Sequence, residues 1–236
     1  MPTITKFDNA NKLKSIPYKD YFGAMQLSKA QLKERIALAE DIEDAMLVLF
    51  ALYPHYLDDI DGFKSEMIKD LTEVVADYVV IDNEISNHIE KIADEVADAT
   101  QRHSDYGLNS KKVADSPTKN EITDDRQGNG QASNDNQKNY WLSSDRAIII
   151  AENEANTICN HSDYAEAVSY GYTKKTWLTM LDDKVRDTHI YLEGETIDID
   201  DVFIVGSSMM RYPKDTEYGA SADEIINCRC VCTYSK

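Results

Sequence analysis

A helical stripe of apolar residues is the clearest pattern in the first quarter of the chain. From Leu32 to Tyr53 the apolar positions recur every three or four residues, which is the period of an amphipathic helix. Ser28 and Gln31 have the spacing of a capping box, and Pro54 favours a helix end just before it. The pattern therefore predicts a helix over residues 28–53.

A second apolar stripe runs from Met67 through Ile81 to Val96, in steps of three and four residues with one irregularity. A seam of this kind is typical of a helix that packs along its length against another helix. We predict one helix over roughly 64–102 that folds back on the first through a short turn at 54–62. Residues 28–103 then form a long helical hairpin, which we interpret as an adaptor region.

The two segments beside this hairpin lack such periodicity. Residues 1–27 contain prolines, a glycine and scattered aromatic residues, which indicates an extended arm that is either a mobile terminus or a partner-binding segment. Residues 104–139 are rich in Ser, Asn, Asp, Lys, Gln and Gly, with no aromatic residue after Tyr106. We expect a polar linker, with disorder favoured over a clamp that folds on binding.

Residues 140–236 mix helical and strand patterns. This mixture predicts a small α+β module, so the chain as a whole is expected to be α+β with a helical N-terminal half. In chain order the expected elements are a helix from Ser143 or Ser144, a short helix over 163–170 that Gly171 stops, a strand over 173–180, a helix over 182–189, a hairpin over 190–199 and a buried strand over 202–205.

The charge distribution narrows the possible partners. The net charge is −18, and residues 41–107 carry four basic against seventeen acidic residues. Such a chain is repelled by free duplex DNA and by anionic membrane surfaces. The acidic block is interpreted as a solvated helix face, with a basic partner surface as the alternative. No apolar run is long enough to span a bilayer, and the first residues lack a secretory signal, so we expect no membrane partner and a cytoplasmic location when the chain is made.

Candidate chemistry is confined to one histidine and a set of alternating cysteines. His189, Cys228 and Cys230 form a metal-like set, because zinc accepts histidine nitrogen and cysteine sulfur, and alternation along a strand would place Cys232 on the same face. The alternative is a metal-free cluster in which His189 hydrogen-bonds a carboxylate and the cysteines pack as small apolar residues. We favour the metal-free cluster, which implies no cofactor, with a structural zinc as the other possibility.

Several motifs of the last quarter together resemble one family. They are Thr176-Trp177-Leu178, Asp187-Thr188-His189, Leu192-Glu193-Gly194, Tyr212-Pro213-Lys214-Asp215 and Asn227-Cys228-Arg229-Cys230. In this order and spacing they resemble the Mu F-like head-morphogenesis, or minor head, proteins of tailed bacteriophages. Upstream, Ser144-Asp145-Arg146-Ala147 and Ala151-Glu152-Asn153-Glu154 resemble that family's Arg-Ala and Ala-Arg-Thr-Glu helix, although the second arginine is missing. The resemblance covers about residues 140–236.

The resemblance implies a structural role in the phage head. A protein of this family is expected to join the prohead by contacting the portal protein, the major capsid protein or both, and to support head assembly or genome delivery. It would be found first in the host cytoplasm and then in the virion, near the portal. No small-molecule substrate and no specific binding to free DNA are expected.

Two other functions remain open at this stage. One is a phage-encoded enzyme or toxin-type effector acting through His189 and the carboxylates nearby in sequence, which are Asp182, Asp187, Glu193 and Asp198. We expect no enzyme, because the chain contains neither a Gly-x-Ser-x-Gly motif nor a phosphate-binding glycine loop. The other is a free coiled-coil adaptor, for which the second apolar stripe would require a partner helix.

Overall fold

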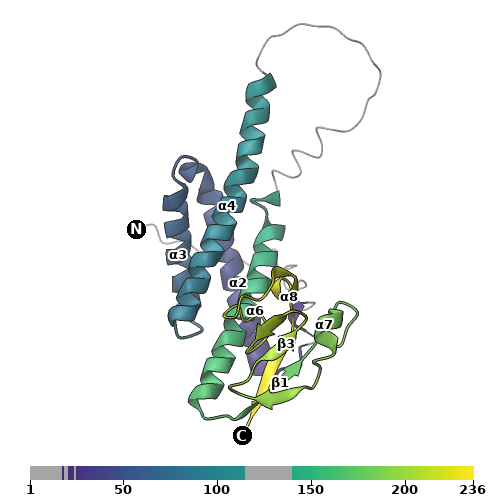
Figure 1. Cartoon of the computed structure of the whole chain (residues 1–236). Coiled ribbons are helices and arrows are strands. Elements are labelled where there is room, and N and C mark those ends of the chain that lie inside the picture. Colours follow the sequence, from purple (N-terminus) through teal and green to yellow (C-terminus); the bar gives the residue numbers. More distant parts are fainter. Residues whose placement is uncertain (1–17, 19–20, 24, 115–139) are drawn as a thin grey trace, which may run out of the picture. The chain divides into compact units, whose positions relative to one another are not determined.

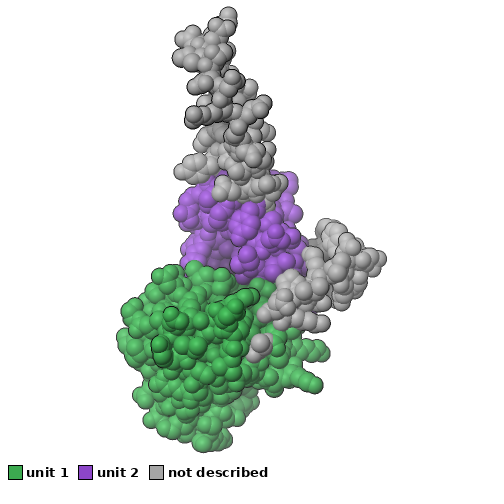
Figure 2. All heavy atoms as spheres, turned by 90° about the vertical axis from the view of Figure 1, so that its right-hand side faces the viewer, with its two compact units in different colours: residues 1–39, 152–236 green, residues 40–151 purple. Residues whose placement is uncertain are grey.

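The computed structural model describes residues 18, 21–23, 25–114 and 140–236 and is α+β, as predicted (Figure 1). Most of the predicted arm and linker therefore lies outside the described residues. The chain forms two compact units, shown in Figure 2: residues 1–39 with 152–236, and residues 40–151. These units differ from the predicted segments, because helices α2 (Lys29–Leu52) and α6 (Ser144–Ser169) each contribute to both.

Helix α2 agrees with the prediction from the sequence at both ends. The Ser28 hydroxyl lies 2.9 Å from Gln31 Oε1 and accepts the Gln31 backbone N–H at 3.3 Å, so the capping box is present. The helix ends at Leu52, and Pro54 lies in the 3₁₀ helix η1 (Tyr53–Tyr56) that follows. Proline lacks the N–H that a continuing α-helix would use, which explains the change of geometry.

The prediction of one continuous second helix is wrong. Residues 64–102 belong to two helices, α3 (Ile60–Ala76) and α4 (Asn83–Ala114). The Asp82 side chain accepts the Ile85 N–H at 2.9 Å at the start of α4, so a capping aspartate lies within what reads as one apolar stripe. The hairpin of the second unit is formed by α3 and α4, which pack against each other. Helix α4 also continues past residue 104, where the linker was predicted to begin.

Helix α6 corrects a second prediction. The sequence indicated one helix near residues 144–158 and another over 163–170, whereas α6 is continuous and ends before Gly171, which has a φ of 68°. Asn160 is buried in the structure and donates to backbone carbonyls elsewhere in its unit. A polar residue inside a helix is thus satisfied by tertiary contacts.

Two small antiparallel sheets complete the first unit. One has the strand order β2–β1–β5, and the other is a β3–β4 hairpin. In the first sheet Trp177 is paired with Cys232, and in the hairpin Val205 is paired with Ser208. The strands are β1 (Lys174–Leu178), β2 (Thr196–Asp198), β3 (Phe203–Val205), β4 (Ser208–Met210) and β5 (Val231–Ser235), and the short helices between them are α7 (Asp187–Ile190) and α8 (Ala222–Ile225).

Two local predictions in this unit are wrong. The helix expected over 182–189 is only α7, and the chain before it is irregular. The hairpin expected within 190–199 is absent, because β2 pairs with β1 instead. The Trp177 carbonyl accepts the Gly194 N–H at 2.9 Å, so residues 190–195 serve as a turn that returns the chain to β1. The predicted strands at 173–180 and 202–205 are confirmed as β1 and β3.

The core of the first unit surrounds Trp177, which is fully buried. Around it lie Phe203, Val205 and Met210 from the β3–β4 hairpin, together with the three cysteines at positions 228, 230 and 232. The described end of the predicted arm also belongs to this unit: the Tyr21 hydroxyl donates to the Cys228 carbonyl at 3.2 Å, and Phe22 is fully buried. Over the described residues, no helix is both long enough and apolar enough to cross a bilayer.

Candidate functional site

The predicted metal-like set comes together in the first unit. His189 lies in α7, while Cys228 and Cys230 lie in the irregular segment just before β5. All three side chains are buried, with His189 only 1% exposed. His189 Nδ1 is 3.4 Å from Cys230 Sγ and 3.6 Å from Cys228 Sγ. One atom of each residue, a ring nitrogen or a sulfur, lies within 4.8 Å of the other two.

A carboxylate faces the other side of the imidazole. Glu224 Oε2, from α8, lies 3.0 Å from His189 Nε2 and accepts the Thr188 hydroxyl at 2.8 Å. The sequence did not single out Glu224, because it lies 35 residues from His189. The available signal was local: Ser221 followed by acidic residues at 223 and 224 is typical of a helix start. This pattern indicates a short helix but not a contact with His189.

The turn of the β3–β4 hairpin brings Gly206 against this carboxylate. Gly206 has a φ of 60°, and a Cβ atom at this position would lie 2.3 Å from Glu224 Oε1. A larger residue here would therefore be strained in the left-handed backbone conformation and would also have to displace the Glu224 carboxylate. The hairpin thus limits where the carboxylate can lie, and the carboxylate in turn orients the His189 ring.

The three ligand-like groups influence one another electrostatically. Burial lowers the pKa of His189, but its hydrogen bonds with Cys228 and Glu224 outweigh burial and raise the pKa above its ordinary value. The pKa of Cys228 lies well below its ordinary range, because hydrogen bonds from Cys230 and, to a smaller extent, from His189 together exceed the effect of burial. The pKa of Cys230 moves upward, because of its hydrogen bond with Cys228 and its burial.

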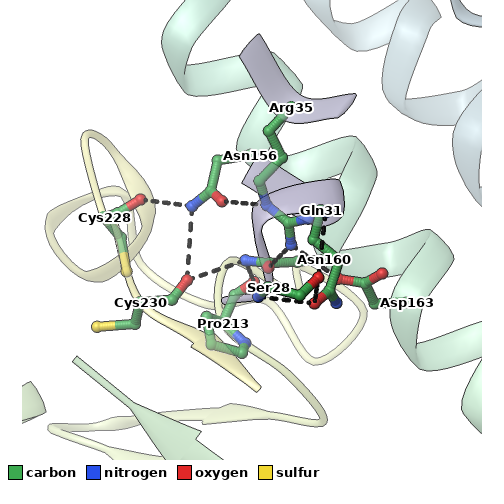
Figure 3. Close-up of polar contacts among 9 residues, drawn as sticks. All are labelled: Ser28, Gln31, Arg35, Asn156, Asn160, Asp163, Pro213, Cys228 and Cys230. Carbon is green, nitrogen blue, oxygen red and sulfur yellow. Dashed lines mark hydrogen bonds and ion pairs between the residues drawn. The ribbon is translucent and has the colours of Figure 1, made fainter. Parts of the chain in front are cut away.

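The backbone of the cysteine segment is fastened to α6 by two buried asparagines (Figure 3). Asn156 Nδ2 donates to the Cys228 carbonyl at 3.1 Å, and Asn160 Nδ2 donates to the Cys230 carbonyl at the same distance. The amide oxygens of both asparagines accept from the Arg35 guanidinium, at 3.4 and 2.9 Å. Side chains of α2 and α6 therefore hold in place the two residues whose sulfurs face His189.

A third asparagine extends this fastening along α6. Asn153 Oδ1 accepts from the buried Lys214 ammonium at 2.6 Å and from the Asn227 N–H at 3.0 Å. Burial lowers the pKa of Lys214 to about 8. Asn153, Asn156 and Asn160 recur at helical spacing, so this face of α6 was visible in the sequence as polar residues on one side of a helix, although we did not assign it a role.

The other residues singled out in the sequence lie elsewhere. Cys232 is buried in β5 opposite Trp177 and is not part of the set. Of the carboxylates proposed to act with His189, Asp182 pairs with Arg229 at 2.7 Å, Glu193 accepts from the Thr179 hydroxyl at 2.6 Å, and Asp198 pairs with Lys174 at 2.5 Å. The carboxylate partner of His189 is Glu224 instead.

Arg146, which belongs to the motifs that resemble the family, makes packing and hydrogen-bond contacts inside the second unit. Its guanidinium donates to the Thr100 hydroxyl at 2.8 Å and to the Val96 carbonyl at 3.2 Å, and it lies over the Trp141 ring. Burial lowers its pKa to about 10. These contacts join α4 to the start of α6 and leave the residue only 6% exposed.

Comparison with known proteins identifies the family of this chain. The family model described as "Phage Mu protein F like protein" matches residues 90–233, more than half of the chain. The chain therefore belongs to the phage Mu protein F-like family. The match includes most of α4, all of α6 and the whole His189–Glu224–cysteine cluster, so the resemblance noted from the sequence motifs is confirmed.

A curated relative shares a shorter segment. The NAD(+)–arginine ADP-ribosyltransferase EFV of Enterococcus faecalis is 31% identical over 90 residues, which are 36% of this chain and 18% of that protein. The chain thus matches less than a fifth of the length of this relative. No solved structure matches the chain.

Proposed function

We propose that this protein is a minor head protein of a tailed bacteriophage that associates with the portal in the prohead and supports head assembly or genome delivery. The observation that carries the proposal is the family match over residues 90–233. Membership of this family indicates a phage head morphogenesis protein, and the portal contact is the finer part of the proposal. The protein would be made in the host cytoplasm and would become part of the virion.

The charge of the second unit supports a protein partner rather than DNA. Residues 41–107 carry seventeen acidic against four basic residues, and phosphate contacts by basic side chains dominate DNA binding. In the α3–α4 hairpin, Lys64 already pairs with Asp94 at 3.0 Å and Asp98 at 2.8 Å. The hairpin therefore offers a portal or capsid protein a predominantly acidic surface.

Co-expression with single head components tests the proposed partner. The full chain is produced with the portal protein of the phage that encodes it, and separately with the major capsid protein, each carrying an affinity tag. We expect retention on the portal at moderate salt and release as the ionic strength rises, because screening weakens contacts between exposed charges. Retention on the capsid protein alone would replace the portal as the partner. Retention on neither would contradict direct association with these head components.

The ADP-ribosyltransferase relative suggests a second candidate function, an enzyme or toxin-type effector. We propose that this chain shares only a segment with that relative and does not act as an ADP-ribosyltransferase, since the match covers 18% of the relative. His189 also makes its carboxylate contact inside a buried cluster. Incubation with labelled NAD+ and an arginine-containing acceptor protein should transfer no label. Transfer that a Glu224→Gln variant abolishes would instead establish the enzymatic function.

A further inference from the structure

We propose that His189 Nδ1, Cys228 Sγ and Cys230 Sγ bind one zinc ion. The site goes beyond the proposed function, because nothing in a head-assembly role requires a metal. The sequence alone favoured a metal-free cluster of the same residues. The geometry of the cluster now favours the metal-bound alternative, for three independent reasons.

The first reason is the spacing of the ligand atoms. Zinc binds thiolate sulfur at about 2.3 Å and histidine nitrogen at about 2.0–2.1 Å in a tetrahedral arrangement, so a nitrogen and a sulfur on one ion lie about 3.6 Å apart. The distances from His189 Nδ1 to the two sulfurs are 3.4 and 3.6 Å. Nitrogen and sulfur are therefore already at the separations that one tetrahedral ion requires.

The second reason is the orientation of the histidine ring. Because a carboxylate oxygen of Glu224 lies 3.0 Å from Nε2, the neutral imidazole would carry its proton on Nε2, and its Nδ1, which faces the two sulfurs, would then be available to bind the ion. A carboxylate that receives the second N–H of a metal-binding histidine is a recurrent feature of zinc sites. The Thr188 hydroxyl holds the carboxylate in turn. The arrangement thus presents the unprotonated nitrogen to the position of the ion.

The third reason is the surroundings of the two cysteines: hydrogen bonds hold their backbone in place, and an indole N–H lies near the cluster. Asn156 and Asn160 hold the carbonyls of Cys228 and Cys230, so both cysteines are held through their backbone. Trp177 Nε1 is buried and has no nitrogen or oxygen partner among the described residues. The indole interacts with Cys230, and its ring packs edge-on against His189 at 5.6 Å. An indole N–H in this place is better matched by a thiolate than by a neutral thiol.

The charges of the ligands are also consistent with zinc. Two thiolates carry the negative charge that balances a divalent ion. The imidazole binds in its neutral form, next to the Glu224 carboxylate. A small hollow on the surface of this unit reaches all three ligand residues, and its other lining residues are Met180, Lys184, Val185, Arg186, Asn227 and Arg229. A water molecule from this hollow is the proposed fourth ligand.

Elemental analysis of the full-length protein tests the proposal. The chain is produced without a polyhistidine tag in zinc-containing medium and purified without added metal. We expect about one zinc per chain, and removal by a strong chelator should lower the melting temperature until zinc, but not magnesium, is returned. Cys228→Ser and Cys230→Ser should lose most of the metal. The matched controls Cys159→Ser and Cys232→Ser alter buried cysteines outside the set and should keep it.

Two further measurements keep the test decisive if the cysteine variants fold poorly. Cobalt added to the metal-free wild-type protein should give thiolate-to-cobalt charge-transfer absorption and the intense visible bands of a tetrahedral site. Glu224→Gln should weaken zinc binding by about 10–100-fold while the ligand set stays the same. Folded wild-type protein that contains no zinc and shows no such cobalt spectrum would overturn the proposal. So would equal zinc content in Cys228→Ser, Cys230→Ser and the two controls.

Discussion

A single glycine limits the position of the carboxylate that orients His189. Gly206→Ala should destabilise the first unit, because alanine is strained at a φ of 60° and its Cβ would lie 2.3 Å from Glu224 Oε1. We expect a loss of about 2–3 kcal/mol in the free energy of unfolding, of which about 1–2 kcal/mol is backbone strain. Urea denaturation of both proteins measures the loss.

The matched control is Gly194→Ala. Gly194 also has a positive φ, 74°, but a Cβ atom there would have no neighbour within 4 Å. This variant should therefore show the backbone strain alone, and the difference between the two variants isolates the contact with Glu224. Equal losses would mean that Glu224 moves aside freely and that Gly206 does not position it.

The Arg211–Asp215 pair gives the first unit a defined acid sensitivity. Asp215 is buried, which raises its pKa, but hydrogen bonds from the Arg211 side chain and from the backbone N–H groups of Glu217 and Arg211 outweigh burial and lower the pKa below its ordinary value. A group whose pKa is lower in the folded than in the unfolded state stabilises the fold above its unfolded pKa. This contribution is lost as the pH falls below about 4.

Asp215→Asn should consequently lower the free energy of unfolding at neutral pH and lower it less in acid. At pH 7 we expect the variant to be less stable by about 2–3 kcal/mol, since the partly exposed Arg211 keeps some access to water. Below about pH 4 the two proteins should converge. Denaturant titrations at several pH values provide the measurement, and a gap that stays constant with pH would show that the carboxylate charge is not the cause.

At the scale of elements, the asparagine face of α6 is expected to hold the cysteine segment. Asn156→Leu leaves the Cys228 carbonyl without this donor and removes one acceptor from the buried Arg35. The Cys228 carbonyl still accepts from the Tyr21 hydroxyl, and Arg35 still donates to Asn160. The expected cost is therefore that of two lost hydrogen bonds, about 0.5–1.5 kcal/mol for the neutral one and about 1.5–3 kcal/mol for the charged one, which should lower the melting temperature. Glu166→Ala, at an exposed position of the same helix, is the control. Similar melting temperatures for both variants would remove α6 as the support of this segment.

The helical hairpin provides a second test at this scale. Ile89 of α4 is 1% exposed, whereas Val80, between the two helices, is 87% exposed. Ile89→Asp should destabilise the second unit by about 3 kcal/mol or more, because it buries an unpaired charge, and Val80→Asp should have little effect. Circular dichroism during thermal unfolding distinguishes them. An unaffected Ile89→Asp variant would mean that the packed face of α4 tolerates a charge.

The elements that could be predicted are those with a strong local signal. Helix α2 has a capping serine, a regular apolar stripe and a terminating proline, and β1 and β3 have short apolar or alternating runs. The break between α3 and α4 was missed because its capping residue, Asp82, also fits a helix surface. Ile81, which the stripe placed in the interface, lies in that connection. The continuity of α6 depends on long-range hydrogen bonds of Asn160, which no local pattern reveals.

The sequence allowed the proposed ligands of the candidate site to be predicted, but not the residues that hold these ligands in place. His189, Cys228 and Cys230 have side chains whose chemistry is recognisable in any sequence. Glu224, Gly206 and the asparagines of α6 acquire their roles only when distant segments meet. Among many acidic residues, sequence proximity favoured carboxylates such as Asp182, Glu193 and Asp198, each of which has another partner. Which carboxylate contacts His189 is therefore determined by the tertiary structure and not by distance along the sequence.

At the scale of the whole molecule, the family match supports a head protein more strongly than any single site does. It covers residues 90–233 and therefore parts of both compact units. The net charge of −18 is compatible with a protein partner and unfavourable for free DNA. The proposed zinc ion would stabilise the first unit, and the test of the metal site is separate from the test of the head-protein role.

Quantitative mass spectrometry of purified proheads is the decisive test of whether this protein is a portal-associated head component. Heads assembled with and without the portal protein are compared, and the amount of this chain is measured relative to the major capsid protein. We expect a few copies per head, far fewer than of the major capsid protein, and the loss of these copies from heads that lack the portal. Absence of the chain from normal heads, or an amount that does not change when the portal is missing, would contradict this expectation.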